Sequence, residues 1–406
     1  MMRGGGRHRT GGRTGAAILA CVVTALALAS GPAAAQMPTT SLGLGYPVNA
    51  VDARSAGMGG VGIGLLGGTF SDRNPADLTA FQVATLSFTG SPQHVSLQGY
   101  SAGKTSRSEI PVLGIVVPVG GWAFGVQASS YLDQDWAVRL QDTLSATAGD
   151  FPYTERREHN GGVSAVDFSV ARSIGPLSLG VTYGRLVGNL RESFTRRFEA
   201  SVDSSALAPN PVTDDAQWSY SGWHVRAGGG LQIGDRIRVG AAYTWAGDLH
   251  ATRDSVGTFH RFPLPDSWAV GASARPLGDL LLSFGGGWQG WSSADASLTG
   301  TRARDVRWGG AGVEFSGLDL GSFPLFLRAG AHYRQLPFRR PGYQALNERS
   351  VSLGAGIAFA GNRAVLDGSV EVGRRGDRAA SGTEERFERF VLTVSLRQVP
   401  IPGLLP

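Results

Sequence analysis

The sequence predicts an all-β protein, a transmembrane antiparallel β-barrel of about fourteen strands with an N-terminal plug inside it. Three features point to this architecture. Apolar and polar residues alternate with a period of two over many segments. Short turns and long polar loops alternate between those segments, and a glycine-rich region precedes the first of them.

The first 35 residues have the pattern of a secretory signal peptide. Four arginines and no acidic residue precede a short apolar run, and Ala33, Ala34 and Ala35 supply the small side chains that a signal peptidase requires. The apolar run is shorter than the ~20 residues of a membrane-spanning helix. We therefore expect residues 1–35 to be cleaved and the mature chain to be exported.

Removal of this leader changes two inferences from composition. The 406 residues include 37 basic and 32 acidic side chains, a net charge of +5, and loss of the four arginines lowers it to +1. The charge therefore gives no reason to expect nucleic-acid binding. The one cysteine, Cys21, is removed as well, so the mature chain forms no disulfide.

The barrel is expected over residues 82–399, followed by a short tail at 400–406. The segment from 236 to 245 shows the pattern, since Ile237, Val239, Ala241, Tyr243 and Trp245 share one face of a strand. Many segments exceed the ~5–6 residues of soluble strands and suit the ~9–11 of tilted membrane strands. The predicted strands lie at 83–95, 108–118, 121–132, 161–174, 177–190, 218–233, 236–247, 266–276, 279–290, 306–316, 323–335, 348–360, 363–375 and 385–397.

The connections separate a membrane barrel from a soluble β-sandwich, whose strands also alternate. Tight turns of the kind Ile233-Gly234-Asp235-Arg236 alternate with long polar loops. This asymmetry is typical of outer-membrane barrels, in which short turns face the periplasm. Closure into a barrel also gives every backbone N–H and C=O a hydrogen-bond partner within the protein, which surrounding lipid does not supply. We expect one monomeric barrel in the outer membrane of a Gram-negative-type bacterium, surrounded by outer-membrane lipid.

A region at 36–81 precedes the first strand and contains the sequence GMGGVG at residues 57–62. These glycines fit a dinucleotide-binding fingerprint, but that motif requires a strand before it and a crossover helix after it, and neither is predicted here. The alternatives are a flexible glycine linker and a compact plug in which glycines permit tight turns.

Residues 53–64, ARSAGMGGVGIG, followed by NPADL at 74–78, resemble the N-terminal hatch of the FadL-type long-chain fatty acid transporter family. The segments 110–125, 264–272 and 288–292 resemble strands of the same family, so the likeness spans most of 50–397. It implies a hatch at 36–81 inside a fourteen-stranded barrel. Asp77 departs from the family pattern, which has glycine at that place.

The resemblance also implies hatch or gating residues and an uptake function. The hatch residues are Met58, Gly59, Gly60, Asn74, Pro75 and Ala76. The entrance of a ligand pocket is assigned to Phe194, Phe198 and Trp218. The implied activity is passive uptake of hydrophobic small molecules, with long-chain fatty acids as the leading candidate.

Charged residues also fall on the faces that the strand pattern assigns to the lumen. One interpretation is an electrostatic network between wall and plug. The other is that Arg226 or Arg328 meets a ligand carboxylate, which a guanidinium binds through two parallel hydrogen bonds. The full set is Arg226, Arg236, Arg238, Arg328, Arg363, Asp167, Asp367 and Glu371.

Other functions receive less support from the sequence. No catalytic constellation is found, and His250 and His260 lack a metal-ligand spacing, so we expect no enzyme, cofactor or metal. Two alternatives to uptake stay open: a porin for polar solutes, and a structural or secretion-associated barrel that binds a protein partner through its loops.

Overall fold

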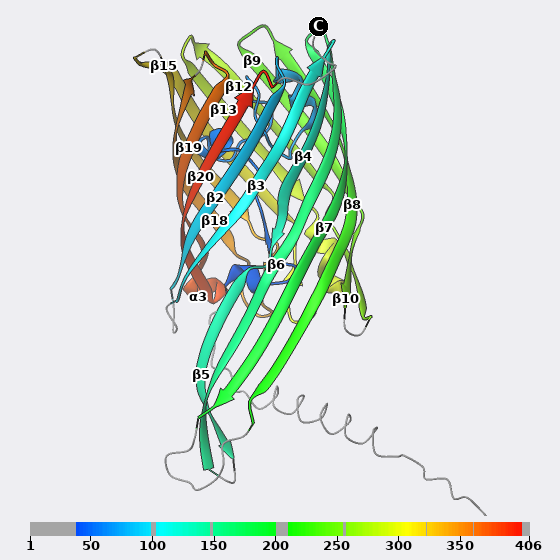
Figure 1. The fold of residues 1–406 in the computed structure, drawn as a ribbon, viewed down its shortest axis with the longest axis vertical. Coiled ribbons are helices and arrows are strands. Elements are labelled where there is room, and N and C mark those ends of the chain that lie inside the picture. Colours follow the sequence, from blue (N-terminus) through cyan, green and yellow to red (C-terminus); the bar gives the residue numbers. More distant parts are fainter. Residues whose placement is uncertain are drawn as a thin grey trace, which may run out of the picture.

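The computed structural model describes residues 38–98, 103–146, 149–199, 210–254, 257–321, 323–359 and 361–399. Within them the chain forms a closed antiparallel β-barrel of fourteen strands, so the predicted architecture is confirmed (Figure 1). The predicted leader at 1–35 and tail at 400–406 lie outside the described residues.

Each strand pairs with its neighbours along the chain, and β20 pairs with β2 to close the ring. All predicted strands are present, several of them longer than expected. The barrel strands are β2 (Thr85–Gln98), β3 (Gly103–Val119), β4 (Trp122–Asp133), β6 (Gly149–Ile174), β7 (Leu177–Phe198), β8 (Val212–Ile233), β9 (Ile237–Ala246), β12 (Ser267–Leu277), β13 (Leu280–Gln289), β15 (Val306–Leu320), β16 (Phe323–Gln335), β18 (Asn347–Phe359), β19 (Ala364–Asp377) and β20 (Thr383–Arg397).

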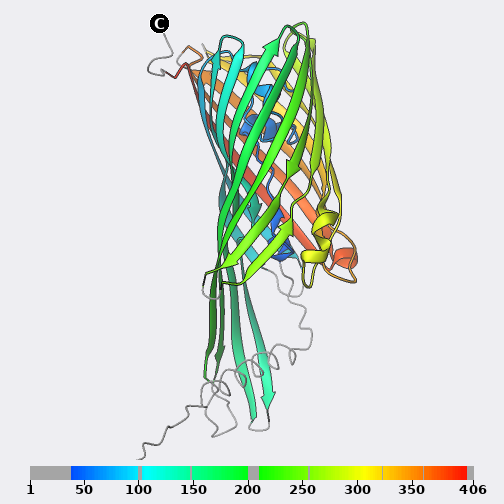
Figure 2. The ribbon, with the colours of Figure 1, turned by 90° about the vertical axis from the view of Figure 1, so that its right-hand side faces the viewer.

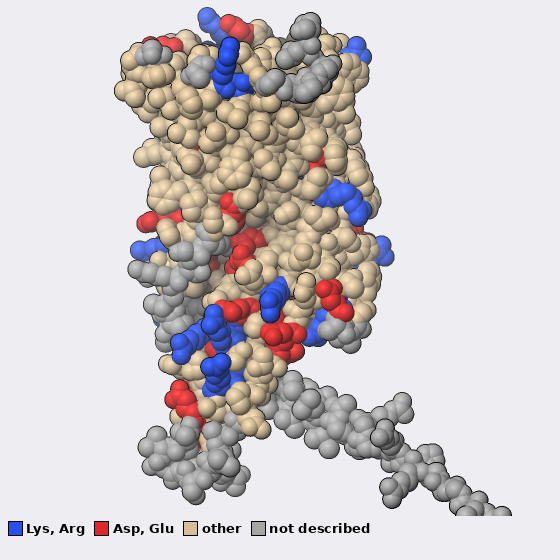
Figure 3. Space-filling model, viewed as in Figure 1, with Lys and Arg blue, Asp and Glu red and all other residues tan. Residues whose placement is uncertain are grey.

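The alternation of side chains explains the barrel. On β7 the residues Leu179, Val181 and Tyr183 are exposed on the outer face, while the residues between them are buried in the lumen. Large apolar side chains cover the outside of the other strands in the same way, and Figure 3 shows a broad uncharged belt with charges mainly toward both ends. Such a belt matches the apolar core of a bilayer.

Short turns join the strands at one end, and long connections lie at the other (Figure 2). The long connections carry further elements that the sequence pattern missed. They are β5 (Trp136–Ala146), β10 (Asp248–Arg253), β11 (Phe259–Pro263), η3 (Trp291–Ser297), β14 (Arg302–Ala303), β17 (Phe338–Arg339) and α3 (Arg378–Ser381). Within the described residues, no helix is both long and apolar enough to cross a bilayer.

A four-stranded extension projects beyond the long-loop end and is called the arm (Figures 1 and 2). It consists of β5 and the outer parts of β6, β7 and β8, that is residues 136–146, 149–160, 191–198 and 212–217. β5 pairs with β6 alone among the described residues, so one of its edges has no partner strand.

The residues before β2 fill the lumen and have two parts. The outer segment, residues 38–47, contains η1 (Thr39–Ser41) and β1 (Tyr46–Pro47) and lies toward the long-loop end (Figure 1). The inner hatch, residues 48–84, contains α2 (Ala53–Gly57) and η2 (Pro75–Ala80) and lies closer to the short turns. A compact plug, rather than a linker, thus occupies the barrel.

Candidate functional site

The inner hatch is built around the carboxylate of Asp52, which caps the short helix α2. It accepts hydrogen bonds from the amides of Ser55 (2.9 Å) and Phe70 (2.8 Å) and from the hydroxyl of Thr69 (2.8 Å). These bonds satisfy free amides at the helix start, as N-caps do, and join two stretches far apart in the sequence. The hatch therefore has a defined internal structure.

The predicted hatch residues Met58, Gly59 and Gly60 pack against β15, β16 and β18. Met58 is fully buried, and Gly59 and Gly60 have φ values of 71° and 70°, which favour glycine. A Cβ atom at Gly312 in the wall would stand 2.5 Å from the Met58 carbonyl oxygen. The hydroxyl of Ser352 accepts a hydrogen bond from the Gly59 amide at 3.3 Å. The glycines therefore serve close packing of the hatch against the wall.

Asn74, Pro75 and Ala76 contact the opposite wall. The Asn74 side chain accepts a hydrogen bond from the Ala76 amide (3.0 Å) and donates one to the Gly229 carbonyl (3.1 Å). Pro75 is the first residue of η2, a position whose backbone N–H would have no partner within the helix, so proline fits there. A Cβ atom at Gly180 would stand 2.7 Å from the Pro75 carbonyl carbon. The motif thus caps its own helix and holds it to β7 and β8.

Asp77, the departure from the FadL-type pattern, links the hatch to the wall. Its carboxylate accepts hydrogen bonds from Nε of Arg238 on β9 (3.0 Å) and from the Gly64 amide (2.9 Å). Arg238 also donates to the Ala76 carbonyl (3.1 Å). The change from glycine was visible in the sequence, but its partner was not, because that contact depends on strand register.

Arg328 lies in a buried network between hatch and wall. Its Nε donates to Glu314 at 2.7 Å and its Nη1 donates to Asp367 at 2.6 Å. Arg54 of the hatch binds the same Glu314 with two hydrogen bonds of 2.9 Å. Both guanidinium groups are therefore neutralised, which matches the network interpretation for Arg328.

Arg226 is less completely paired. Its Nε donates to Thr244 at 3.0 Å, and its Nη1 is 3.5 Å from Asp167. His224 lies 3.2 Å from the other oxygen of Asp167. The predicted lumen position of Arg226 is confirmed, as are those of Arg238, Arg328, Asp167, Asp367 and Glu371. The prediction for Arg236 and Arg363 is wrong, because both lie exposed in turns just outside their strands.

A cavity of about 70 Å³ adjoins Arg226 and is called the outer cavity. Arg73 of the hatch, Tyr131 and Trp308 also line it. The Arg73 guanidinium stacks on the Trp308 ring at 3.6 Å, and its Nε is buried without a hydrogen-bond partner. Removal from water lowers the pKa of Arg73 to about 10, with Asp72 opposing the shift. Arg73 and Arg226 therefore bring two guanidinium groups to one small space, together with the carboxylate of Asp72.

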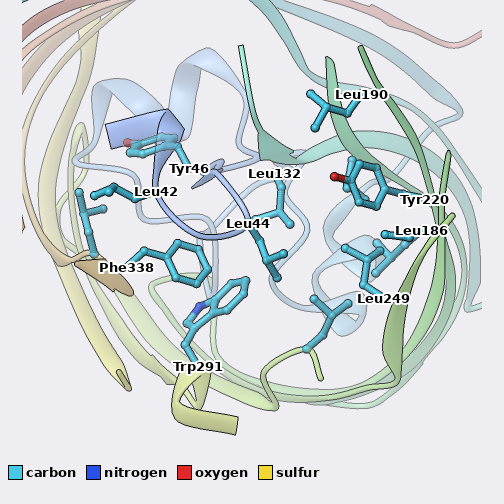
Figure 4. Close-up of a cluster of buried hydrophobic side chains, with 14 of the residues drawn as sticks. Leu42, Leu44, Tyr46, Leu132, Leu186, Leu190, Tyr220, Leu249, Trp291 and Phe338 are labelled. Atoms are coloured by element: carbon cyan, nitrogen blue, oxygen red, sulfur yellow. The ribbon is translucent and has the colours of Figure 1, made fainter. Parts of the chain in front are cut away.

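An apolar cluster fills the lumen toward the long-loop end and is called the chamber (Figure 4). Figure 4 shows Leu44 of the outer segment near its centre, with Leu42 beside Tyr46 and Phe338. Its buried residues are Leu42, Leu44, Tyr46, Leu132, Val163, Ala165, Leu186, Leu190, Tyr220, Leu249, Ala251, Leu264, Trp291, Val306, Leu336, Phe338 and Leu346. The wall of the chamber thus closes around the chain's own N-terminal residues.

Polar bonds hold the outer segment in this position. Thr39 donates to Glu385 from its amide (2.6 Å) and its hydroxyl (2.9 Å). The Tyr46 hydroxyl donates to Glu348 at 2.6 Å, and the Tyr46 ring lies 4.2 Å from the Arg375 guanidinium. The segment therefore has a polar side toward β18–β20 and an apolar side toward the chamber.

Among the described residues, His332, Glu348 and Glu371 bring possible metal-ligand atoms within 4.8 Å of one another. Arg375 already pairs with Glu348 at 2.5 Å, and Arg389 pairs with Glu371 at 3.0 Å. A dication would have to displace these buried guanidinium groups, so the chemistry of the cluster fits an ion-pair network better than a metal centre.

The three predicted entrance aromatics do not converge on one place. Trp218 packs against the chamber. Phe194 and Phe198 lie on the arm, where Phe194 is beside Arg196 and the Phe198 ring is 5.8 Å from Tyr153. The prediction treated this region as a loop, so it could not separate the barrel mouth from the arm.

The barrel wall changes beside the chamber. β3 pairs with β4 only as far as Val112 and Ser129. β4 then continues inward, where Asp133 pairs with Tyr46 of the outer segment, and Figure 1 shows β4 ending short of β3 and β6. Among the described residues, no strand pairs with positions 103–111 of β3 on that side. At the level of the outer segment, the wall therefore lacks the backbone hydrogen bonds that would join β3 to its next neighbour.

Solved structures with similar folds include two toluene transporters and a FadL homologue. The toluene transporter TbuX of Ralstonia pickettii is 19% identical, with 85% of this chain and 98% of that chain covered and a TM-score of 0.56. A Pseudomonas aeruginosa FadL homologue is 14% identical, with 87% and 100% covered and a TM-score of 0.58. The toluene transporter TodX of P. putida is 14% identical, with 87% and 99% covered and a TM-score of 0.54.

These similarities show a FadL-type fold, as the sequence resemblance predicted, and the apolar belt places the barrel in an outer membrane. None of the curated proteins matches the sequence. The family model of BamG matches residues 16–238, which is more than half of the chain. The chain therefore belongs to the BamG family.

Proposed function

We propose that the barrel is a channel for passive uptake of hydrophobic small molecules across the outer membrane. The observation that carries this proposal is the chamber, an apolar lumen that encloses Leu42 and Leu44 of the chain itself. Apolar side chains bind apolar solutes because burial removes both surfaces from water. A solute would replace these leucines when the outer segment moves.

The route begins at the long-loop end or where β4 leaves β3, and it leads into the chamber. The inner hatch lies beyond it, held by Met58, Asn74 and Asp77. Movement of the hatch would then release the solute toward the short turns. That TbuX and TodX are toluene transporters, and CymD a monoaromatic hydrocarbon channel, supports an apolar cargo for this fold.

Long-chain fatty acids are the leading substrate, and Arg226 is the residue assigned to their carboxylate. Arg226 adjoins the outer cavity with Arg73, and its one ion pair is long, with 3.5 Å to an Asp167 carboxylate that also faces His224. Guanidinium groups in such a place favour an anion. Arg328 fits this role less well because two carboxylates already bind it.

Mass spectrometry on the mature barrel, purified without added fatty acid, tests this assignment. We expect fatty acids or other apolar compounds to co-purify, and fatty acids to be depleted in Arg226→Gln. Arg191→Gln, on the exposed surface of the arm, is the matched control and should retain them. An empty wild-type barrel, or equal retention in Arg226→Gln, would count against the assignment.

The polar-solute porin finds little support, because the outer segment and hatch occupy the lumen. Steady ion conductance of the wild-type barrel in planar bilayers would revive it.

A second candidate function is a barrel that binds a protein partner, and the arm favours it. An ordered four-stranded sheet beyond the membrane offers contact surface that a solute channel does not require.

The hairpin of β5 and the outer part of β6 can be removed without disturbing the barrel, because its two ends are already close together. The Asp135 side chain accepts a hydrogen bond from the Gly161 amide at 2.8 Å. We expect excision of residues 137–159, with two glycines inserted, to leave the barrel folded and to abolish co-purification of a stoichiometric partner. Undiminished uptake by this variant would assign the arm to partner binding and not to transport.

A further inference from the structure

A second cavity, of about 190 Å³, lies on the opposite side of the hatch and is called the inner cavity. It is enclosed by the hatch residues around Arg54 and Gly68 and by the wall near the short turns, where Thr85 begins β2 and Arg397 ends β20. It is therefore separate from the outer cavity and the chamber, and it adjoins the end from which a solute would leave.

One part of this cavity is apolar. Phe70 and Phe81 of the hatch lie with ring centroids 4.9 Å apart, and Phe326, Leu66 and Val365 complete the surface. A Cβ atom at residue 68 would stand 2.7 Å from the Phe81 ring, so glycine there allows the ring its place. These side chains offer an apolar body van der Waals contact.

The carboxylates around the cavity are already bound. Glu314 accepts from Arg54 and Arg328, and Asp367 accepts from Arg328 at 2.6 Å. Asp52 accepts from the hatch's own amides and from Thr69. None of the three acids is free to neutralise another cation.

Two arginines of the lining have no such partner. Arg275 and Arg397 form no ion pair within the described part of the chain, and the Arg275 Nε is buried without a hydrogen bond. The lining carries four arginines against three acids, a formal excess of one positive charge. Arg275 is half-buried, whereas Arg397 is exposed at the edge of the cavity. A half-buried guanidinium without an ion-pair partner gains stability when an anion binds it, and an exposed one beside it adds attraction for the same anion.

We propose that the inner cavity binds the carboxylate of an acyl or aryl acid through Arg275 and Arg397, with the apolar body against Phe70, Phe81 and Phe326. This deepens the proposed uptake function, on which its place as the last stop before release rests. It assigns an acidic headgroup to the cargo. The volume holds the headgroup and a short apolar part, and a longer chain extends past the hatch.

Calorimetric titration of the mature barrel in detergent tests the site, with decanoate as the probe and 1-decanol and inorganic phosphate as comparison probes. We expect Arg275→Gln and Arg397→Gln each to weaken decanoate binding about tenfold, since each removes a charge-assisted hydrogen bond to the carboxylate. Decanol binding should not change. Arg236→Gln, in an exposed turn at the same end, is the matched control. Heat-modifiable mobility in gel electrophoresis verifies that each barrel is folded.

A photoreactive decanoate provides the second measurement, and we expect it to label the peptide around Phe81 or Phe326. Decanoate affinity unchanged in both arginine variants would overturn the proposal, even if decanoate binds and is transported, because that result places the carboxylate elsewhere. Phosphate bound as tightly as decanoate would also overturn it. If arginine-dependent binding is found but no uptake, the site stands and the transport function fails.

Discussion

Single residues decide how firmly the hatch is held, and three of them have different roles. Arg328 joins two wall acids, Asp77 joins the hatch to Arg238, and Asn74 joins it to a wall carbonyl. The first is an ion pair within the wall, whereas the others connect parts that must separate if the hatch moves. Substitutions at these places should therefore affect stability and uptake differently.

Replacing Arg328 by Met should lower the free energy of unfolding by about 3–5 kcal/mol, because it leaves Asp367 buried without its cation. Urea unfolding of the barrel in lipid vesicles measures this change. Arg363→Met, in an exposed turn, should have little effect. The double variant Arg328→Met/Asp367→Leu should recover much of the loss, and no recovery would mean that the ion pair is not the cause.

Replacing Asn74 by Ala removes a helix cap and one bond to the wall, each contributing about 1 kcal/mol. We expect the barrel to stay folded and uptake of a hydrophobic probe to rise several-fold, because hatch release becomes easier. Cells expressing each variant are assayed with labelled decanoate. Asn160→Ala on the arm is the control. Unchanged uptake in a folded Asn74→Ala barrel would remove the gating role from this motif.

At the level of elements, the hatch and the strands fit because glycines in the wall face it. Gly312 receives the backbone of Met58, and Gly180 receives Pro75. These contacts place α2 and η2 against opposite sides of the lumen without intervening side chains. The fit is steric, so it should respond to a single methyl group.

Gly312→Ala should displace the hatch, since the added Cβ would stand 2.5 Å from the Met58 carbonyl oxygen. We expect ion leakage in planar bilayers above that of the wild type and a lower unfolding midpoint. Gly309→Ala lies on the same strand, where its Cβ has ordinary contacts at 3.7 Å, and should behave as wild type. Equal conductance of all three proteins would show that the hatch tolerates this contact.

The strands were predictable where they cross lipid and less so elsewhere. Alternation identifies β9 or β16 because one face meets lipid and the other the lumen. Beyond the membrane that contrast ends, so β5 and the outer halves of β6 to β8 read as polar loops. The errors at Arg236 and Arg363 have a related cause, since the predicted alternation began one residue before β9 and one residue before β19. The glycine contacts and the partner of Asp77 depend on register across distant strands, which local pattern does not encode.

At the scale of the whole molecule, the outer segment and the hatch form one path through the barrel. The polar anchors of Thr39 and Tyr46 hold the outer segment while its leucines occupy the chamber. Uptake through the chamber therefore requires that this segment move.

A disulfide can test that requirement, because the mature chain is expected to contain no cysteine. Pro47 and Leu132 are paired positions of β1 and β4, and cross-strand pairs have the Cα spacing that a disulfide needs. We expect Pro47→Cys/Leu132→Cys to block uptake when oxidised and to regain it on reduction. Ser87→Cys/Ser395→Cys, which joins two wall strands, should transport in both states. Transport by the oxidised Pro47–Leu132 pair would show that uptake does not require β1 to move.

The position of the outer segment has a consequence for biogenesis. Fourteen strands return the chain to the side where it began, but the hatch adds one further passage through the lumen. The beginning of the described chain therefore lies in the lumen toward the long-loop end, whereas its end lies beside the short turns. An exported chain arrives from the periplasm, so we expect residues 38–47 to reach the long-loop end of the lumen before β2 and β20 pair. The pairing of β2 with β20, which closes the barrel, would then enclose an outer segment that is already in the lumen.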